Sequence, residues 1–347
     1  MEKGPTTPQK TTDPNPYPPL TPDKPWLAPL AGFSDLPFRM LCREYGAAAA
    51  CTEMVSAKGL VYQGCGSWDL VRSIPRVPED RPLIVQIFGS ELPFIQEAVR
   101  RLLDWGAAYF DLNAGCPVKK VVKTGAGAGL LQNSEQLAAT LQAMVSLAGE
   151  GRVGVKLRSG WSAAEFVSGD AAIRLDDIGL GWISLHPRSA LQGLSGAADW
   201  SLIGKLKQRI RTPLLASGDL YSARDGIDCL KRTAADGIMY ARGALANPAL
   251  FQDHLLLLQE GGEAELDRTT DLERRLHIAR RHVALCRRYA DTRKNLLKMR
   301  TILPKYLKGF PDASAVRSRM VRAASWEEVE SILEGLDPAT LRESSFG

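Results

Sequence analysis

Short apolar segments alternate with amphipathic segments of helical length from residue 26 onward. Eight apolar or β-branched runs, each followed by a turn or a helical pattern, predict eight strands. These strands cover residues 26–31, 48–54, 83–88, 109–113, 153–157, 182–186, 214–217 and 237–240. Helical patterns lie between them, for example at 91–105, 134–147 and 199–209. This order is typical of βα units that build a parallel sheet.

Eight strands favour a closed barrel over an open, doubly wound sheet. The first strand is not followed by the GxGxxG pattern of dinucleotide-binding sheets. We therefore predict an α/β fold, a (β/α)₈ TIM barrel over residues 25–255, with an all-helical domain after it.

The two ends of the chain differ from the barrel. Residues 1–24 are rich in Pro, Thr, Lys and Asp and predict a disordered tail, because they contain too few apolar residues to offset the entropy of ordering. Residues 260–267 predict a linker. Residues 268–340 predict a helical domain, with helical patterns at 272–289, 296–307 and 326–336 and Ser325 as an N-cap.

The charge of the chain is concentrated in this helical part. The net charge is +5, but residues 271–325 hold 15 Lys and Arg against four Asp and Glu. Such an excess is expected for polyanion binding, although a solvated helical face is the simpler interpretation. No apolar run approaches the ~20 residues that span a bilayer, so we expect a cytoplasmic protein without membrane contact. The six cysteines form no CxxC pair, which predicts neither disulfides nor a metal site.

Candidate site residues lie at or near the carboxyl end of each predicted strand, where barrel enzymes build their active sites. In strand order they are Pro29, Leu30, Ala31 and Gly32; Glu53 and Met54; Gln86; Asn113 and Cys116; Lys156 and Arg158; His186 and Arg188; Ser217, Gly218 and Asp219; and Ala241, Arg242 and Gly243. Their combination, more than any one of them, indicates a site at this end.

Lys156 stands near the end of its strand, where its charge requires an anion or an electron-rich partner. A flavin ring is such a partner, because negative charge develops on the ring when it is reduced. Loops after strands seven and eight commonly bind phosphate in this fold, and here they contain Gly218 and Arg242. His186 is placed to bond a flavin phosphate or ribityl group. The structural alternatives are that Lys156 is solvated, that the two loops are ordinary turns, and that His186 is hydrogen-bonded to the backbone.

Cys116 differs from the other cysteines in its surroundings. It lies between Gly115 and Pro117 and precedes a Lys-, Gly- and Ala-rich segment at 119–129, which predicts a mobile active-site loop. Nearby lysines and a position at the barrel mouth are conditions for an accessible thiol. We interpret Cys42, Cys51, Cys229 and Cys286 as packing residues and assign no role to Cys65.

The chain resembles bacterial tRNA-dihydrouridine synthases from about residue 26 to residue 336, and looks most similar to their B-type subgroup. Residues 27–39 read LAPLAGFSDLPFR and resemble the family's opening motif, and residues 113–117 read NAGCP and resemble its active-site motif. TEM at 52–54, VKLR at 155–158, HPRS at 186–189 and GIMYARGA at 237–244 follow in the family's order. KMR at 298–300 and YLKG at 306–309 resemble its helical tRNA-binding domain.

The resemblance implies a monomeric, metal-free enzyme that reduces a D-loop uridine of tRNA. NADPH would reduce FMN, the flavin would deliver hydride to uracil C6, and Cys116 would protonate C5. The implied FMN contacts are Pro29, Leu30, Ala31, Gln86, Lys156, His186, Ser217, Gly218, Asp219, Ala241 and Arg242. The implied substrate contacts are Asn113, Arg158, Arg188, Lys298 and Arg300.

Three positions depart from the family's pattern, and two other interpretations stay open. Ser217 replaces Asn and Ala241 replaces Gly, and both keep backbone donors, while Leu194 replaces a Tyr that would contact the flipped base. One alternative is an FMN-barrel oxidoreductase of a small pyrimidine, related to dihydroorotate or dihydropyrimidine dehydrogenases. The other is a catalytically silent tRNA-binding protein. The basic segment weighs against the first, and the joint presence of Cys116, Lys156 and His186 weighs against the second.

Overall fold

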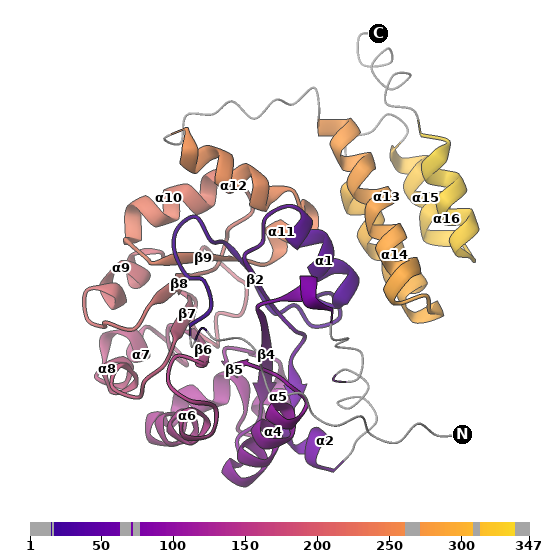
Figure 1. The fold of residues 1–347 in the computed structure, drawn as a ribbon. Coiled ribbons are helices and arrows are strands. Elements are labelled where there is room, and N and C mark those ends of the chain that lie inside the picture. Colours follow the sequence, from indigo (N-terminus) through magenta and orange to yellow (C-terminus); the bar gives the residue numbers. More distant parts are fainter. Residues whose placement is uncertain are drawn as a thin grey trace.

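A closed parallel barrel surrounded by helices forms the larger part of the molecule. The computed structural model describes residues 15, 17–62, 71, 77–260, 271–307 and 313–336. Residues 271–307 and 313–336, called here the C-terminal helical segment, lie beside the barrel (Figure 1). This architecture confirms the predicted fold class.

The barrel strands follow one another in chain order. They are β1 (Trp26–Leu27), β2 (Ala49–Cys51), β3 (Val55–Ser56), β4 (Leu83–Phe88), β5 (Tyr109–Ala114), β6 (Val153–Arg158), β7 (Trp182–His186), β8 (Leu214–Ala216) and β9 (Gly237–Tyr240). β1 pairs with both β2 and β9, and β2 pairs with β4, so the ring closes. The second predicted strand is split, because β2 ends at Cys51 and β3 pairs separately with the end of β4. β1 is shorter than predicted because residues 30–34 form a turn in which Leu30 O accepts two backbone N–H groups.

The helices surround the barrel and continue after it. They are α1 (Leu36–Glu44), α2 (Ala57–Val61), α4 (Leu92–Asp104), α5 (Lys119–Val122), α6 (Ser134–Ala148), α7 (Glu165–Ser168), α8 (Ala171–Asp176), α9 (Ser201–Lys207), α10 (Ala223–Thr233), α11 (Arg242–Ala246), α12 (Leu250–Gln259), α13 (Asp271–Tyr289), α14 (Arg293–Tyr306), α15 (Ala313–Arg322) and α16 (Trp326–Glu334), with 3-10 segments η1 (Pro78–Asp80) and η2 (Gly127–Gln132). Sequence patterns missed α15, because it buries only Val316 and Met320. Across the described ranges, no helix is long and apolar enough to cross a membrane.

Large side chains fill the barrel interior. Trp26 and Trp182 pack edge to face, with ring centroids 5.3 Å apart. Trp182 fits only because β6 carries Gly154 opposite it, where an added Cβ would lie 2.0 Å from the indole. A second layer of apolar side chains lies between the strands and the outer helices. The interior is therefore a packed core with its site at one end.

Residues 17–24 make defined contacts, although their composition predicts part of a disordered tail. Trp26 Nε1 donates to Pro19 O at 2.7 Å, and His254 Nε2 bonds to Pro22 O at 2.8 Å. These bonds join the segment to the barrel end opposite the predicted site and offset the entropy of ordering it. Residues 1–14 and 16 lie outside the described residues, as does most of the predicted linker.

The C-terminal helical segment docks beside the barrel mouth. α13 packs along α1, where Arg281 forms an ion pair with Glu44. α14 contacts α11, and its Lys298 pairs with Asp35 and donates to Phe33 O at 3.3 Å. Since the Phe33 loop and α11 follow β1 and β9, α14 lies at the carboxyl ends of the strands.

The docking face of α13 contains the fully buried His282. Its ring lies 5.7 Å from Phe38 and 5.9 Å from Tyr306, and Nδ1 is 3.1 Å from the Tyr306 hydroxyl. Burial, with a smaller effect of the Lys298 charge, lowers the pKa of His282 to about 3. Below pH ~6.5 the unfolded chain therefore binds more protons than the native protein, and the free energy of unfolding falls by up to about 1.4 kcal/mol per pH unit toward pH 3.

We predict that His282→Gln lowers stability at pH 7.5 but flattens its loss on acidification to pH 5, measured as the free energy of unfolding in urea. His277→Gln is the matched control, because His277 is exposed on the same helix. It should keep the wild-type pH profile. A His282→Gln profile parallel to that of the wild type would contradict the assignment.

Candidate functional site

A cavity of about 210 Å³ lies at the carboxyl ends of the barrel strands. It brings together ten predicted site residues from five separate parts of the chain. They are Pro29, Leu30, Lys156, Arg158, His186, Ser217, Gly218, Asp219, Ala241 and Arg242. Sequence patterns missed Tyr221 and Met239, which also line the cavity. Ala31, predicted with its neighbours, is exposed and does not line it.

The cavity is electropositive. Burial lowers the pKa of Lys156 to about 8, and the charge of Asp111 opposes this shift. Burial also lowers the pKa of Arg158 to about 10, with a further contribution from the Arg188 charge. Both shifts mean that the cations lack solvation, so the cavity favours an anionic or electron-rich ligand.

His186 is a neutral imidazole at the cavity wall. Burial lowers its pKa to about 2, and the charges of Lys156, Arg158 and Arg188 add to the shift. Arg188 Nη1 lies 3.1 Å from His186 Nε2. Because a guanidinium only donates, Nε2 accepts and the ring proton is on Nδ1.

Arg188 holds a loop together and does not point free donors at the cavity. It is buried and binds Asp219 with two nitrogens, at 2.7 and 2.6 Å, and it also donates to Gly196 O at 2.5 Å. These donors are thus engaged within the protein, and the substrate contact expected of Arg188 stays a prediction. Asp219 also accepts from Arg242 Nη2 at 3.1 Å. Burial raises the pKa of Asp219, but hydrogen bonds led by Arg188 outweigh it and the net pKa is lowered.

The loop after β8 requires glycine beside His186. Gly218 has φ +101°, and an added Cβ would lie 2.5 Å from His186 Cδ2. The Arg242 guanidinium stacks over Tyr221, 5.0 Å from the ring centroid. The backbone at Gly218 therefore approaches the histidine more closely than a side chain would allow.

Cys116 is half-buried in a loop held against β6. Its N–H donates to Asn113 Oδ1 at 2.9 Å, and Arg158 Nε donates to Gly115 O at 2.8 Å. Ala128 N donates to Cys116 O at 2.9 Å. Residues 119–129, predicted to form a mobile active-site loop, contain α5 and the start of η2, and η2 packs directly on Cys116.

Two predicted ligand contacts, Gln86 and Asn113, use their amides inside the barrel. Gln86 Nε2 donates to Asp111 Oδ2 at 2.8 Å, and Gln86 Oε1 accepts from Asn113 Nδ2 at 2.9 Å. Both side chains are buried, and Gln86 does not line the cavity. Asp111 was missed by the sequence patterns, although its spacing of two from Asn113 on one strand places both on the inner face.

Lys298 and Arg300 also serve internal contacts. Lys298 pairs with Asp35, and Arg300 Nη2 donates to Ala323 O, at the end of α15, at 2.5 Å. Their contact with the substrate stays a prediction. Cys65 and residues 308–309 of the tail motif lie outside the described residues.

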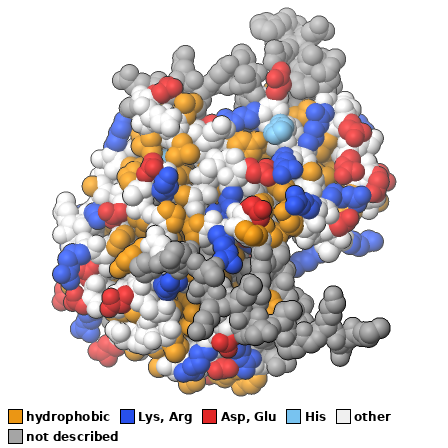
Figure 2. All heavy atoms as spheres, viewed as in Figure 1, with side chains coloured by type: hydrophobic (Ala, Val, Ile, Leu, Met, Phe, Trp, Pro, Cys, Tyr) orange, Lys and Arg blue, Asp and Glu red, His pale blue; other side chains and the backbone are white. Residues whose placement is uncertain are grey.

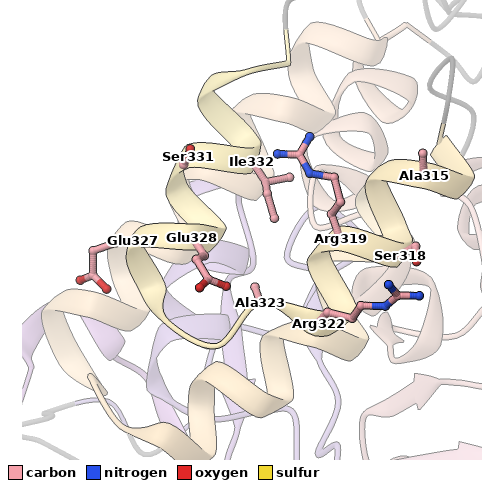
Figure 3. Close-up of a pocket in the computed structure, with 9 residues that line it drawn as sticks. All are labelled: Ala315, Ser318, Arg319, Arg322, Ala323, Glu327, Glu328, Ser331 and Ile332. Carbon is pink, nitrogen blue, oxygen red and sulfur yellow. The ribbon is translucent and has the colours of Figure 1, made fainter.

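A wider groove of about 740 Å³ lies between α15 and α16 (Figure 3). Arg319 and Arg322 line one side, and Glu327, Glu328 and Ile332 line the other. Two cations and two anions line this groove, whereas three cations and one anion line the barrel cavity. Within the described ranges, no group of three or more His, Cys, Asp or Glu is arranged to hold a metal ion.

Comparison with known proteins identifies similar chains. The family model described as dihydrouridine synthase (Dus) matches residues 26–343. A probable tRNA-dihydrouridine synthase 1 from Synechocystis is 34% identical over 312 residues, 88% of this chain and 84% of that protein. A tRNA-dihydrouridine synthase B from Xanthomonas axonopodis pv. citri is 34% identical over 236 residues, 68% of this chain and 70% of that protein. The solved 6-hydroxypseudooxynicotine amine oxidase of Pseudomonas geniculata N1 shares the fold alone, with a TM-score of 0.53, 12% identity, and coverage of 72% of this chain and 48% of that one.

Proposed function

The chain belongs to the dihydrouridine synthase family, and from this premise we propose that it reduces the C5–C6 bond of a D-loop uridine in tRNA, with FMN as its flavin and NADPH as electron donor. Enzymes of this family are flavin-dependent oxidoreductases. The observation that carries the proposal is the position of Cys116. Its backbone is bound to Asn113, the strand neighbour of Lys156, beside a cavity lined by cations.

Three features support FMN as the ligand of the barrel cavity. Lys156 supplies a poorly solvated positive charge suited to a reduced flavin ring. Gly218 leaves a cradle beside His186 that a Cβ would fill. The first turn of α11 begins at Arg242 and directs backbone N–H groups outward, as phosphate sites of this fold do. Bound FMN would supply the two electrons of the reduction.

Of the remaining cavity residues, four are proposed to contact the flavin and Asp219 is proposed to orient neighbouring arginines. We assign flavin contacts to the backbone and side chains of Pro29, Leu30, Ser217 and Ala241, which line the same cavity. Asp219 would orient Arg188 and Arg242, because a carboxylate beside a phosphate would repel it.

Cys116 is proposed as the acid that protonates uracil C5. A thiol carries an S–H proton that it can donate to carbon and regain from solvent. Arg158 lines the cavity, where Nε donates to Gly115 O and Nη1 donates to the backbone oxygens of Ser189 and Gly193. We therefore assign the uracil edge to its Nη2, which bonds to no described residue. Asn113, expected in the same role, instead binds the backbone of the Cys116 loop.

Exposed cations of the C-terminal helical segment are proposed to contact the tRNA phosphates. Arg293, Lys294 and Lys305 on α14, and Arg319 and Arg322 on α15, are exposed, and their side chains pair with no other described residue. In Figure 2, Lys and Arg over this segment are interspersed with Asp and Glu, so individual cations rather than one continuous patch would make the contacts. Because α14 lies at the barrel mouth, bound tRNA would place a flipped uridine near Cys116, at a cost of about a few kcal/mol for unstacking.

The first test maps dihydrouridine in tRNA from cells that lack the gene. We expect loss at one or a few D-loop positions, rescue by the wild type, and no rescue by Cys116→Ala. Cys229→Ala, a change at a buried cysteine on α10, is the matched control and should rescue. Full rescue by Cys116→Ala would refute the acid role.

The second test concerns the tRNA surface. Arg319→Ala/Arg322→Ala should raise KM for tRNA with little change in kcat, because the lost contacts are to phosphates remote from the chemistry. The salt dependence of log KM should weaken by about 0.7 per lost phosphate contact. Arg211→Ala, an exposed arginine paired with Asp176 and Asp177 on the barrel, is the control and should behave as the wild type. An unchanged KM and salt dependence in the double variant would remove α15 from the proposed surface.

A further inference from the structure

A row of side-chain hydrogen bonds connects the middle of the barrel to the Cys116 backbone. Trp182 Nε1 and Gln86 Nε2 donate to the two oxygens of Asp111, at 3.0 and 2.8 Å. Asn113 Nδ2 donates to Gln86 Oε1 at 2.9 Å, and Asn113 Oδ1 accepts from Cys116 N–H at 2.9 Å. All four side chains are buried, so each bond lacks competition from solvent.

At the two ends of this row the donor and acceptor roles are fixed, whereas in its middle they are not. We call this order of donors and acceptors the polarity of the row. A carboxylate only accepts and a backbone N–H only donates, but an amide can present either its oxygen or its nitrogen to a neighbour. Because Asp111 accepts, Gln86 turns its nitrogen toward Asp111 and its oxygen toward Asn113. Asn113 must then turn its oxygen toward the backbone N–H groups of Gly115 and Cys116, which it does.

We propose that Asp111 is a positioning residue for Cys116, acting by setting the direction of the hydrogen bonds that run through Gln86 and Asn113. The carboxylate thereby fixes the half-buried thiol beside the cavity. This inference rests on the proposed function only in taking Cys116 as the proton donor. The positioning itself is a property of the barrel.

Strand register supports this role. Gln86 and Asp111 are partners across β4 and β5, and Asn113 is the partner of Lys156 across β5 and β6. The row therefore ends beside the lysine that lines the cavity. Arg158 Nε and Ala128 N hold the same loop by its backbone oxygens. Asn113 is the acceptor for the loop's N–H groups, so its orientation decides whether those donors are satisfied.

Asp111→Asn tests the polarity directly, since it keeps the shape and replaces one acceptor oxygen by a donor. Trp182 Nε1 would donate to the one oxygen that remains at position 111, and the new amide nitrogen at that position would face Gln86. Gln86 and then Asn113 would have to turn, and the Asn113 nitrogen would face the backbone N–H groups. A buried donor opposite a donor is unfavourable, so the loop should move.

The reverse exchange should restore the row. In Asp111→Asn/Gln86→Glu, the new carboxylate accepts both from the new amide and from Asn113, which can keep its native orientation. Gln86→Glu alone places two carboxylates together and should disturb the loop. This pair of changes keeps the charge count and most of the packing, so a rescue reports polarity alone.

The measurements are hydrogen exchange of the peptide containing residues 115–116 and the rate of Cys116 alkylation by iodoacetamide, both on the folded full chain. We expect each single variant to raise both rates by about tenfold, on the scale of one unmet buried hydrogen bond. The double variant should return to within about threefold of wild type. Ser184→Ala, which removes a buried unpaired hydroxyl on β7, is the control and should change neither rate.

Two outcomes would overturn the inference. One is unchanged exchange and alkylation in Asp111→Asn; the other is a double variant as disturbed as its parents. If the double variant does not fold, Asp111→Asn/Trp182→Phe replaces it, because loss of the indole donor frees the new amide to turn its oxygen toward Gln86. Neither readout involves tRNA. A Cys116→Ala variant that retains activity would therefore end the acid role while leaving the positioning result intact.

Discussion

Barrel closure is the constraint on which the rest of the structure depends. β1 pairs with β2 on one side and with β9 on the other. This ring brings residues from Pro29 to Arg242 to one small cavity, although they are separated by most of the barrel sequence. Trp182 packed against Gly154 fills the ring below the cavity and leaves its carboxyl end for chemistry.

The cavity contains poorly solvated positive charges that a negatively charged ligand would stabilise. Lys156 and Arg158 are poorly solvated, and burial lowers the pKa of both because it disfavours their charged forms. Asp219 pairs instead with Arg188 and Arg242. A bound flavin phosphate and an electron-rich ring would supply the missing negative charge. Burial, with a smaller effect of the same cations, keeps His186 neutral, so it serves as a hydrogen-bonding group and not as a charge.

Patterns local in sequence predicted the fold and most of the cavity, because strand periodicity alone places Lys156 and His186 at strand ends. Contacts between distant segments were not predictable in this way. No local pattern indicated that Arg188 pairs with Asp219 or that Lys298 pairs with Asp35. α15 was missed because its apolar positions are few. Asp111 could have been found from the sequence, because residues two apart on one strand lie on the same face and Asp111 precedes Asn113 by two.

We propose that a flavin in this cavity passes its electrons to a tRNA base. A single-turnover experiment without oxygen tests it: the purified holoenzyme is reduced with one equivalent of NADPH and mixed with unmodified tRNA. We expect reoxidation of the flavin on adding tRNA, with one dihydrouridine formed per flavin. A flavin that stays reduced with tRNA but is reoxidised by a free pyrimidine would contradict it.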